Sequence, residues 1–192
     1  MRSIGIFGGT FDPIHIGHLI TAQAVREKRN LDKIIFIPTL ISPHKTEIPT
    51  ISPIHRLEMI KLSIKNIPYF DFSKIEIENQ AISYTIDTLF SLRKQFDNIE
   101  LIIGFDNILK FSTWKNPDNI LMLSKLIVLR RKLSELPEVE DKYYKSAIFV
   151  DTPTIEISSS EVRERIKNNL QIKFLVPAKV EQYIYKHNLY KE

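Results

Sequence analysis

Short runs of apolar residues alternate along the chain with longer stretches in which apolar residues recur every three or four positions. The short runs are typical of buried strands, whereas the longer spacing is typical of helices that bury one face. The runs predict five strands, at residues 4–7, 33–37, 100–103, 126–129 and 147–150. The longer stretches predict helices at residues 18–28, 53–65, 85–95, 160–167 and 177–187. Strands and helices that alternate in this way favour an α/β fold with a parallel sheet.

Two segments between these elements differ from the rest. Residues 38–52 contain several prolines and a tail rich in Ser and Thr, which predict a long loop or lid. The mixed charges of residues 130–145 predict a solvated helix or loop. A chain of 192 residues fits one domain with a full core. We therefore expect a single domain over residues 1–192, in which a C-terminal helical part, residues 155–192, packs on a Rossmann-like core, an open parallel sheet with helices on both faces.

Composition narrows the class of protein. With 43% hydrophobic and 26% charged residues, the chain has the composition of a globular protein. It has no apolar stretch of roughly 18 residues and enters a strand at once, which argues against a membrane span or a secretory signal. The absence of cysteine excludes disulfides and thiolate metal sites and fits a cytoplasmic location. The net charge of +4 comes from scattered lysines and favours phosphorylated ligands over a nucleic-acid surface.

The candidate chemistry begins directly after the first predicted strand, in the segment GGTFDPIHIGHL of residues 8–19. Its two glycines allow a backbone to come close to a ligand, and the helix start that follows offers unpaired N–H groups to an anion. His15 and His18 are three residues apart, so both imidazoles face one pocket if Gly17 lies in the first helical turn. A structural loop with two satisfied histidines is the alternative. The segment has neither the Gly-Lys-Ser/Thr of a Walker loop nor a Gly-x-Gly-x-x-Gly fingerprint.

This segment resembles the signature Gly-Gly-Thr-Phe-Asp-Pro-x-His-x-Gly-His of the bacterial nicotinate-mononucleotide adenylyltransferases, within the His-x-Gly-His nucleotidyltransferase superfamily. The resemblance implies a nucleotidyltransferase-type fold and a turn that binds ATP through Gly8, Gly9, Thr10, Phe11, His15 and His18. The sequence Pro43-His44-Lys45 is similar to a Pro-His-Lys element of the family, which implies that Lys45 reaches the triphosphate as a mobile charge. Catalytic roles are implied for His15, His18 and Lys45.

The segment Ser83-Tyr84-Thr85 opens a predicted helix, with Ser83 as its N-cap. A good helix start is all that local physics requires of it. The segment also resembles the Ser-Tyr-Thr-x-x-Thr-Leu motif of the family, whose backbone amides bind the pyridine carboxylate of nicotinate mononucleotide. The resemblance therefore implies a mononucleotide site at Ser83, Tyr84 and Thr85. Ala81-Ile82 stand where the family commonly has a glycine.

Two further residues lie at the carboxyl edge of the predicted sheet, where ligands of open parallel sheets bind. The Asp106 carboxylate can accept hydrogen bonds from ribose hydroxyls or can cap a helix. Gly104 and Asp106 match a Gly-x-Asp motif of the family, which implies that both bind ATP and that Asp106 also binds the mononucleotide. Trp114, the only tryptophan, is either a core residue or a platform for a ligand. The resemblance implies that Trp114 stacks on the pyridinium ring of the mononucleotide.

A second candidate phosphate clamp lies near the C-terminus. Ser158 and Glu161 predict a capping box at a helix start. The surrounding residues resemble the Ile-Ser-Ser-Thr-x-Ile-Arg motif of the family, which implies that ATP is bound by Ile157, Ser158, Ser159 and Arg163 and that Arg163 is catalytic. Residues 130–132 depart from the Arg-Pro-Gly that often ends a strand in the family, so we assign neither Arg130 nor Arg131 to the site.

The resemblance spans nearly the whole chain and implies that the adenylyl group of ATP is joined to nicotinate mononucleotide, giving nicotinate adenine dinucleotide and pyrophosphate in NAD biosynthesis. The attacking 5′-phosphate has a second pKa of about 6 and needs no general base at neutral pH. The sequence contains no clustered Asp/Glu metal site, so Mg²⁺ is expected mainly on the ATP phosphates and water.

We expect ATP and nicotinate mononucleotide as partners, with neither nucleic acid nor membrane. The sequence leaves the oligomeric state open, a homo-oligomer included. Two alternatives differ in the motifs or the activity that they require. A sister transferase, such as a pantetheine-phosphate adenylyltransferase or a glycerol-phosphate cytidylyltransferase, would lack the Ser-Tyr-Thr motif, Trp114 and the serine-rich motif before Arg163. A nucleotide sensor would keep the fold without releasing pyrophosphate.

Overall fold

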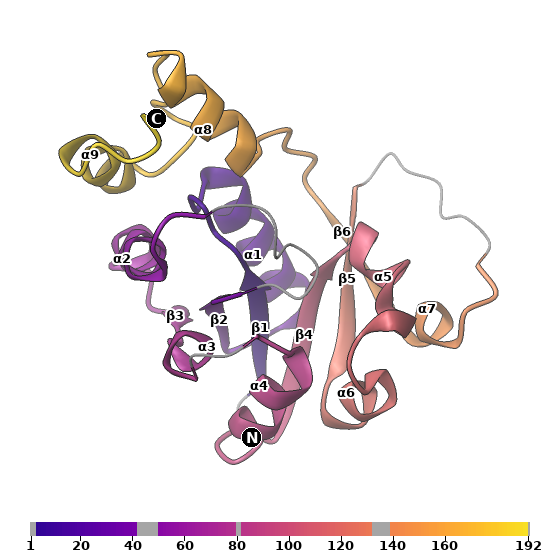
Figure 1. Cartoon of the computed structure of the whole chain (residues 1–192). Coiled ribbons are helices and arrows are strands. Elements are labelled where there is room, and N and C mark those ends of the chain that lie inside the picture. Colours follow the sequence, from indigo (N-terminus) through magenta and orange to yellow (C-terminus); the bar gives the residue numbers. More distant parts are fainter. Residues whose placement is uncertain (1–2, 42–49, 80–81, 132–138, 192) are drawn as a thin grey trace.

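A six-stranded parallel sheet forms the centre of the computed structural model, which describes residues 3–41, 50–79, 82–131 and 139–191 (Figure 1). The strands are β1 (Ser3–Gly9), β2 (Lys33–Pro38), β3 (Phe70–Phe72), β4 (Asn98–Gly104), β5 (Lys125–Arg131) and β6 (Ile148–Thr152). They lie in the order β3-β2-β1-β4-β5-β6, and every neighbouring pair is parallel. The five predicted strands and the Rossmann-like open sheet are therefore confirmed. The strand order reverses between β1 and β4, and this is where such sheets bind ligands.

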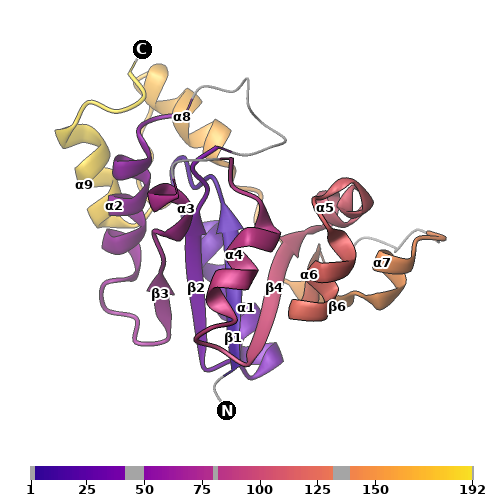
Figure 2. The same ribbon diagram turned by 60° about the horizontal axis from the view of Figure 1, so that its bottom comes forward.

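Helices connect the strands and cover both faces of the sheet (Figure 2). Within the described residues they are α1 (Ile16–Arg29), α2 (Pro53–Ile64), α3 (Ile75–Glu78), α4 (Thr85–Leu92), α5 (Phe105–Ile108), α6 (Pro117–Leu123), α7 (Lys142–Ser146), α8 (Ser159–Lys167) and α9 (Ala178–Lys186), with a short 3-10 helix at Phe111–Thr113. None of the helices in this part of the chain is long and apolar enough to cross a membrane.

The sheet separates two hydrophobic cores because alternate residues of each strand point to opposite faces. On β2, Ile34 and Phe36 belong to the first core, whereas Ile35 and Ile37 belong to the second. The first core also contains residues of α1, α2, α8 and α9, and the second contains residues of α4, α5, α6 and α7. Helices on both faces of the sheet were predicted and are confirmed.

Helix α9 lies beside α2, and both C-terminal helices, α8 and α9, lie away from α5, α6 and α7 (Figure 1). Val162 and Ile166 of α8 are buried in the first core together with Val180 and Ile184 of α9. Because one continuous core joins these helices to the sheet, we propose that the chain folds as a single domain.

Some elements were missed because they are too short to show a periodic pattern. Strand β3 has three residues, and helices α3 and α5 have four each. Helix α6 is longer and starts at Asn116-Pro117, a start signal that the sequence does contain. Helix α1 begins at Ile16, two residues before the predicted start, and α4 ends at Leu92, three residues before the predicted end.

The prediction of a solvated segment at residues 130–145 is wrong in part. Strand β5 extends to Arg131, and Tyr143 and Tyr144 of α7 are buried in the second core. Charged residues flank these two tyrosines in the sequence, so no apolar pattern predicted that they are buried. Residues 132–138 of this segment lie outside the described residues. The same holds for residues 42–49, which belong to the predicted loop or lid.

Candidate functional site

The predicted motifs meet at the carboxyl edge of the sheet, around the ends of β1, β4 and β5. Strand β1 ends at Gly9, and α1 starts at Ile16, so Gly17 lies in the first helical turn as predicted. A Cβ atom on Gly17 would lie only 3.0 Å from Nδ1 of His15. A side chain at this position would crowd the His15 ring, so glycine lets the ring lie against the start of α1.

Two cavities open at this edge and share a wall. The first, of about 440 Å³, is lined by residues that include Gly8, Gly9, Thr10, His18, Ser83, Tyr84, Thr85, Gly104 and Trp114. The second, of about 540 Å³, is lined by residues that include His15, Gly17, His18, Gly104, Asp106, Arg130 and Ile157. Phe7, His18, Gly104 and Leu129 border both cavities. A group held at His18 would therefore lie where the two cavities meet.

The two histidines form a stacked pair at this junction. Their ring centroids are 3.7 Å apart and their planes differ by 30°. The backbone N–H of His15 donates to Nδ1 of His18 over 3.2 Å, so the neutral His18 ring bears its proton on Nε2 and can donate from there. The Phe11 ring packs against His18 with a centroid distance of 5.0 Å. Phe11 is buried and its side chain lines neither cavity, so it supports His18 instead of facing a ligand.

Both imidazoles are neutral at neutral pH. Burial lowers the pKa of His15 to about 4. Burial, and secondarily the nearby His15, lowers the pKa of His18 well below its usual value. Two charged rings so close together would repel each other in a medium of low dielectric constant. The two rings therefore offer N–H donors to an anion while both are uncharged.

The serine-rich motif places its side chains against the turn between β1 and α1. Ser158 is the N-cap of α8, where its hydroxyl accepts from the Glu161 N–H over 3.0 Å, which confirms one of the two hydrogen bonds of the predicted capping box. Ser159 donates to the Pro13 carbonyl over 2.8 Å, and Arg163 donates to the Asp12 carbonyl over 2.7 Å. Ser158, Ser159 and Arg163 line neither cavity, whereas Ile157 lines the second.

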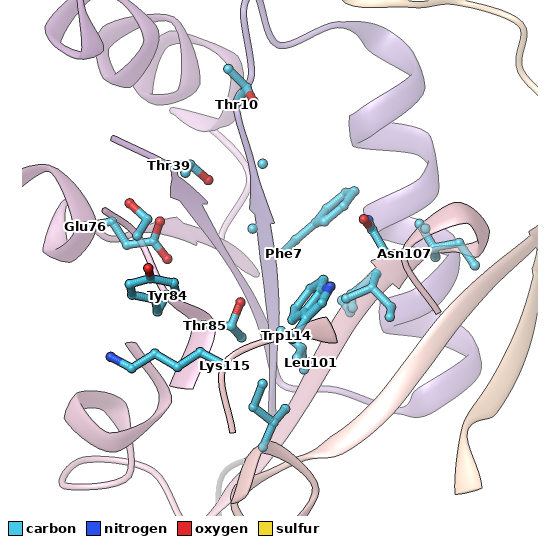
Figure 3. Close-up of a pocket in the computed structure, with 18 of the residues that line it drawn as sticks. Phe7, Thr10, Thr39, Glu76, Tyr84, Thr85, Leu101, Asn107, Trp114 and Lys115 are labelled. Atoms are coloured by element: carbon cyan, nitrogen blue, oxygen red, sulfur yellow. The ribbon is translucent and has the colours of Figure 1, made fainter. Parts of the chain in front are cut away.

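The Ser83-Tyr84-Thr85 segment lies at the wall of the first cavity (Figure 3). The N-cap of α4 is Tyr84, so the prediction of Ser83 as N-cap is wrong. The Ser83 hydroxyl instead accepts from the Leu40 N–H over 3.1 Å, and its own N–H donates to the Ile41 carbonyl. Ser83 thereby ties the start of α4 to the residues that follow β2. The Asp87 N–H donates to the Tyr84 carbonyl, whereas the N–H groups of Thr85 and Ile86 precede the first intrahelical hydrogen bond and can meet a ligand there.

Trp114 is a residue at the edge of the core, and its role as a platform for a ligand stays a prediction. Its indole packs on Phe111 with a centroid distance of 5.1 Å and belongs to the edge of the second core. It also lines the first cavity, where Figure 3 shows it across from Tyr84 and Thr85. The ring is thus fixed by packing on one side while it borders the space for a ligand.

Two charged residues that the sequence analysis did not assign, Lys115 and Glu76, also line the first cavity. Lys115 lies 4.4 Å above the Tyr84 ring and forms an ion pair of 2.9 Å with Asp87. Glu76 is buried, and its Oε1 accepts from the Thr88 hydroxyl over 2.8 Å. Burial raises the pKa of Glu76. Lys115 adds positive charge near the start of α4. Its position next to Trp114 in the sequence could have indicated that it belongs to the site.

The second cavity contains two charged side chains from strand ends. Asp106 lies in the first turn of α5, whose N-cap is Gly104, so the alternative of Asp106 as helix cap is wrong. Arg130, which we did not assign, also lines this cavity and pairs with Asp151 over 2.5 Å. Its position at the end of β5 was the signal for a site residue. Lys45 lies outside the described residues.

The described part of the chain contains no group of three His, Asp or Glu side chains arranged to hold a metal ion. The two imidazoles at the junction of the cavities offer nitrogen atoms, whereas Mg²⁺ prefers oxygen ligands in octahedral geometry. Within the described residues, the donors at this edge therefore do not fit a resident Mg²⁺.

Comparisons with known proteins agree with this geometry. The model of the cytidylyltransferase-like family matches residues 6–165. A protein of Caldicellulosiruptor saccharolyticus named "Probable nicotinate-nucleotide adenylyltransferase" is 39% identical over 98% of this chain and 99% of its own. A protein of Dictyoglomus turgidum with the same name is 42% identical over 98% of this chain and 96% of its own. The fold matches a solved Plasmodium falciparum nicotinic acid mononucleotide adenylyltransferase complexed with NaAD, with a TM-score of 0.81, 21% identity and coverage of 99% and 98%.

A Rossmann-like sheet with a glycine turn, a histidine pair and two adjoining cavities at its carboxyl edge defines a nucleotidyltransferase. The chain belongs to the cytidylyltransferase-like family and, within it, to the nicotinate-nucleotide adenylyltransferases, because its relatives of that name are similar over almost their full length. The resemblance found in the sequence is thereby confirmed.

Proposed function

We propose that this protein transfers the adenylyl group of ATP to nicotinate mononucleotide, forming nicotinate adenine dinucleotide and pyrophosphate in NAD biosynthesis. The main support is the pair of cavities that share His18 as a wall. Two nucleotides that bind one in each cavity would bring their phosphates together at this residue. The names of the relatives support the same reaction.

Nicotinate mononucleotide fits the first cavity. Its carboxylate would accept from the N–H groups at the start of α4, with added attraction from the helix dipole and from Lys115. The cationic pyridinium ring would stack on Trp114. Ser83 would hold this helix start in place, and Asp106 would accept from ribose hydroxyls where the cavities meet.

ATP fits the second cavity, with its triphosphate against the start of α1. The triphosphate would extend past His18 to the border of the first cavity, which Gly8, Gly9 and Thr10 line, and the backbone of these residues and of Phe11 would approach it there. The rings of His15 and His18 would donate to the phosphates. Gly104, Asp106 and Ile157 would contact the adenosine part. Lys45 and Arg163 would add positive charge towards the departing pyrophosphate, with Ser158 and Ser159 holding the start of α8 beside them.

The reaction requires positioning and charge stabilisation. The mononucleotide phosphate is already largely ionised, since its second pKa is about 6, so it attacks the α-phosphorus without a base. The Nε2–H of His18 would donate to the oxygens on which negative charge builds, and the low dielectric constant around the buried ring strengthens this interaction. Mg²⁺ enters as part of the substrate MgATP. A cytoplasmic location is part of this proposal.

The test is product formation with matched acid and amide substrates. The protein with MgATP and nicotinate mononucleotide should release pyrophosphate and form the dinucleotide. If the acid gains about 2–4 kcal/mol from charge-assisted hydrogen bonds at α4, kcat/KM should favour it about 30- to 1,000-fold over nicotinamide mononucleotide. Trp114→Ala should weaken both substrates by a similar factor, because both have the same pyridinium ring.

The outcomes separate the alternatives. Equal use of acid and amide would show that the carboxylate site is misassigned. Pyrophosphate release only with pantetheine phosphate, or with CTP and glycerol phosphate, would identify a sister transferase. ATP binding without pyrophosphate release from any of these acceptors would identify a sensor.

A further inference from the structure

The turn that precedes α1 is held by residues far away in the sequence. Its backbone and side-chain groups form hydrogen bonds of 2.7 to 2.9 Å with Arg56, Ser159, Arg163, Leu175 and Tyr190. Four of these five partners belong to the C-terminal part of the chain. The position of the turn, and of the histidine pair that follows it, therefore depends on the C-terminal part.

Asp12 is the centre of this attachment. Its side chain is buried, and the Tyr190 hydroxyl donates to its Oδ1 over 2.7 Å. Arg163 donates to the Asp12 backbone carbonyl, while its Nη1 is 4.0 Å from Oδ2 of the same residue. A buried carboxylate without hydrogen bonds is costly, so the Tyr190 hydroxyl meets a real need of this group. Burial raises the pKa of Tyr190, which keeps its hydroxyl a neutral donor.

Tyr190 adopts a backbone conformation that disfavours an aromatic side chain. Its φ is 65°, in the left-handed region, where the Cβ atom comes too close to the carbonyl oxygen. The preceding Leu189 is buried in the first core and fixes the chain at this point. The strained conformation is thus maintained by packing and by the hydrogen bond to Asp12.

We propose that Tyr190 is a positioning residue for adenylyl transfer, because its hydroxyl fixes Asp12 and thereby the turn that presents His15 and His18 to the phosphates. Tyr190 lines neither cavity and acts through Asp12, which lies three residues before His15. The inference rests on the proposed function for its kinetic test. Since a misplacement of about 1 Å can cost about 100-fold in rate, loss of this one hydrogen bond should appear in kcat.

The test compares Tyr190→Phe with Tyr185→Phe. Tyr185 is exposed on α9, so its variant controls for the loss of a tyrosine hydroxyl from the same part of the chain. Tyr190→Phe should lower kcat between about 10- and 100-fold at saturating substrates while circular dichroism shows a folded protein. Tyr185→Phe should match the wild type. A kcat for Tyr190→Phe within twofold of the wild type, whatever its melting temperature, would overturn the proposal.

Two further measurements keep the proposal testable. If Tyr190 acts through Asp12, kcat should fall by the same factor in Asp12→Ala and in the double variant that also contains Tyr190→Phe. Factors that multiply in the double variant would contradict the proposal. Pyrophosphate binding by calorimetry needs no reaction, and we expect at least fivefold weaker binding to Tyr190→Phe. If the wild type forms no dinucleotide but this difference remains, the proposed function is wrong and the positioning role holds. Equal pyrophosphate affinities would overturn the positioning role.

Discussion

Lowering the pH should destabilise the fold through His15. Its pKa is about 4 in the folded protein and 6.5 for an unperturbed histidine, because burial disfavours the charged ring. The unfolded chain therefore binds more protons than the folded protein between these two pH values. The stabilisation is complete above pH 6.5, is lost as the pH falls through this window, and declines no further below pH 4.

The magnitude follows from the difference of about 2.5 between the two pKa values. At 1.36 kcal/mol for each pKa unit, the whole window corresponds to about 3 kcal/mol, of which about 2 kcal/mol is lost by pH 5. His15 is only 7% exposed, so solvent screens little of this free-energy difference. The pKa of His18 is also lowered, so the loss for the wild type is larger than for His15 alone.

The assay is urea unfolding of the wild type and of His15→Asn at pH 7.5 and at pH 5.0. Asn is a good N-cap, so the variant keeps a suitable residue at the start of α1. The wild type should lose about 2 kcal/mol more than the variant between these pH values. Other titrating groups are common to both proteins and largely cancel in the difference. Equal losses, with unchanged m-values, would refute the neutral, buried His15 on which the mechanism depends.

Three further predictions concern the reaction. His18→Ala should lower kcat by about 100-fold or more, because loss of a donor to transition-state charge costs about 3 kcal/mol; near-normal turnover of a folded variant would remove His18 from the mechanism. Gly17→Ala should lower kcat about tenfold with α1 intact by circular dichroism, because its Cβ would push the His15 ring from a distance of 3.0 Å; unchanged kinetics would show that the position of this ring does not matter. ATP that is chirally labelled at the α-phosphorus should react with inversion, measured by ³¹P NMR of the product, whereas retention would indicate a covalent adenylyl-enzyme.

Elements with a clear local pattern of apolar, turn and capping residues could be predicted from the sequence. The β1 run and the turn after it could be predicted because strand, glycine turn and helix start are local signals. The Ser158 cap was predicted for the same reason, since its partner lies three residues away. The motifs were expected at one edge of the sheet because parallel strands end there.

Contacts that depend on distant residues could not be predicted. Ser83 is followed by a helix, which favours an N-cap, but its hydroxyl meets Leu40 because strand β2 ends beside it. Arg56 is fully buried and donates to the Thr10 carbonyl, although its charge predicts an exposed position. Tyr190 gave no sign of its contact with Asp12, from which 178 positions separate it.

The separation between these partners has a consequence for folding kinetics. The bonds from Ser159, Arg163 and Tyr190 to the turn before α1 join residues that are 146, 151 and 178 positions apart. Closing such long segments costs chain entropy, which is recovered only when the intervening sheet and helices have formed. Secondary structure should therefore return before enzymatic competence during refolding from denaturant. The interval between the two would be the time that the C-terminal helices need to dock.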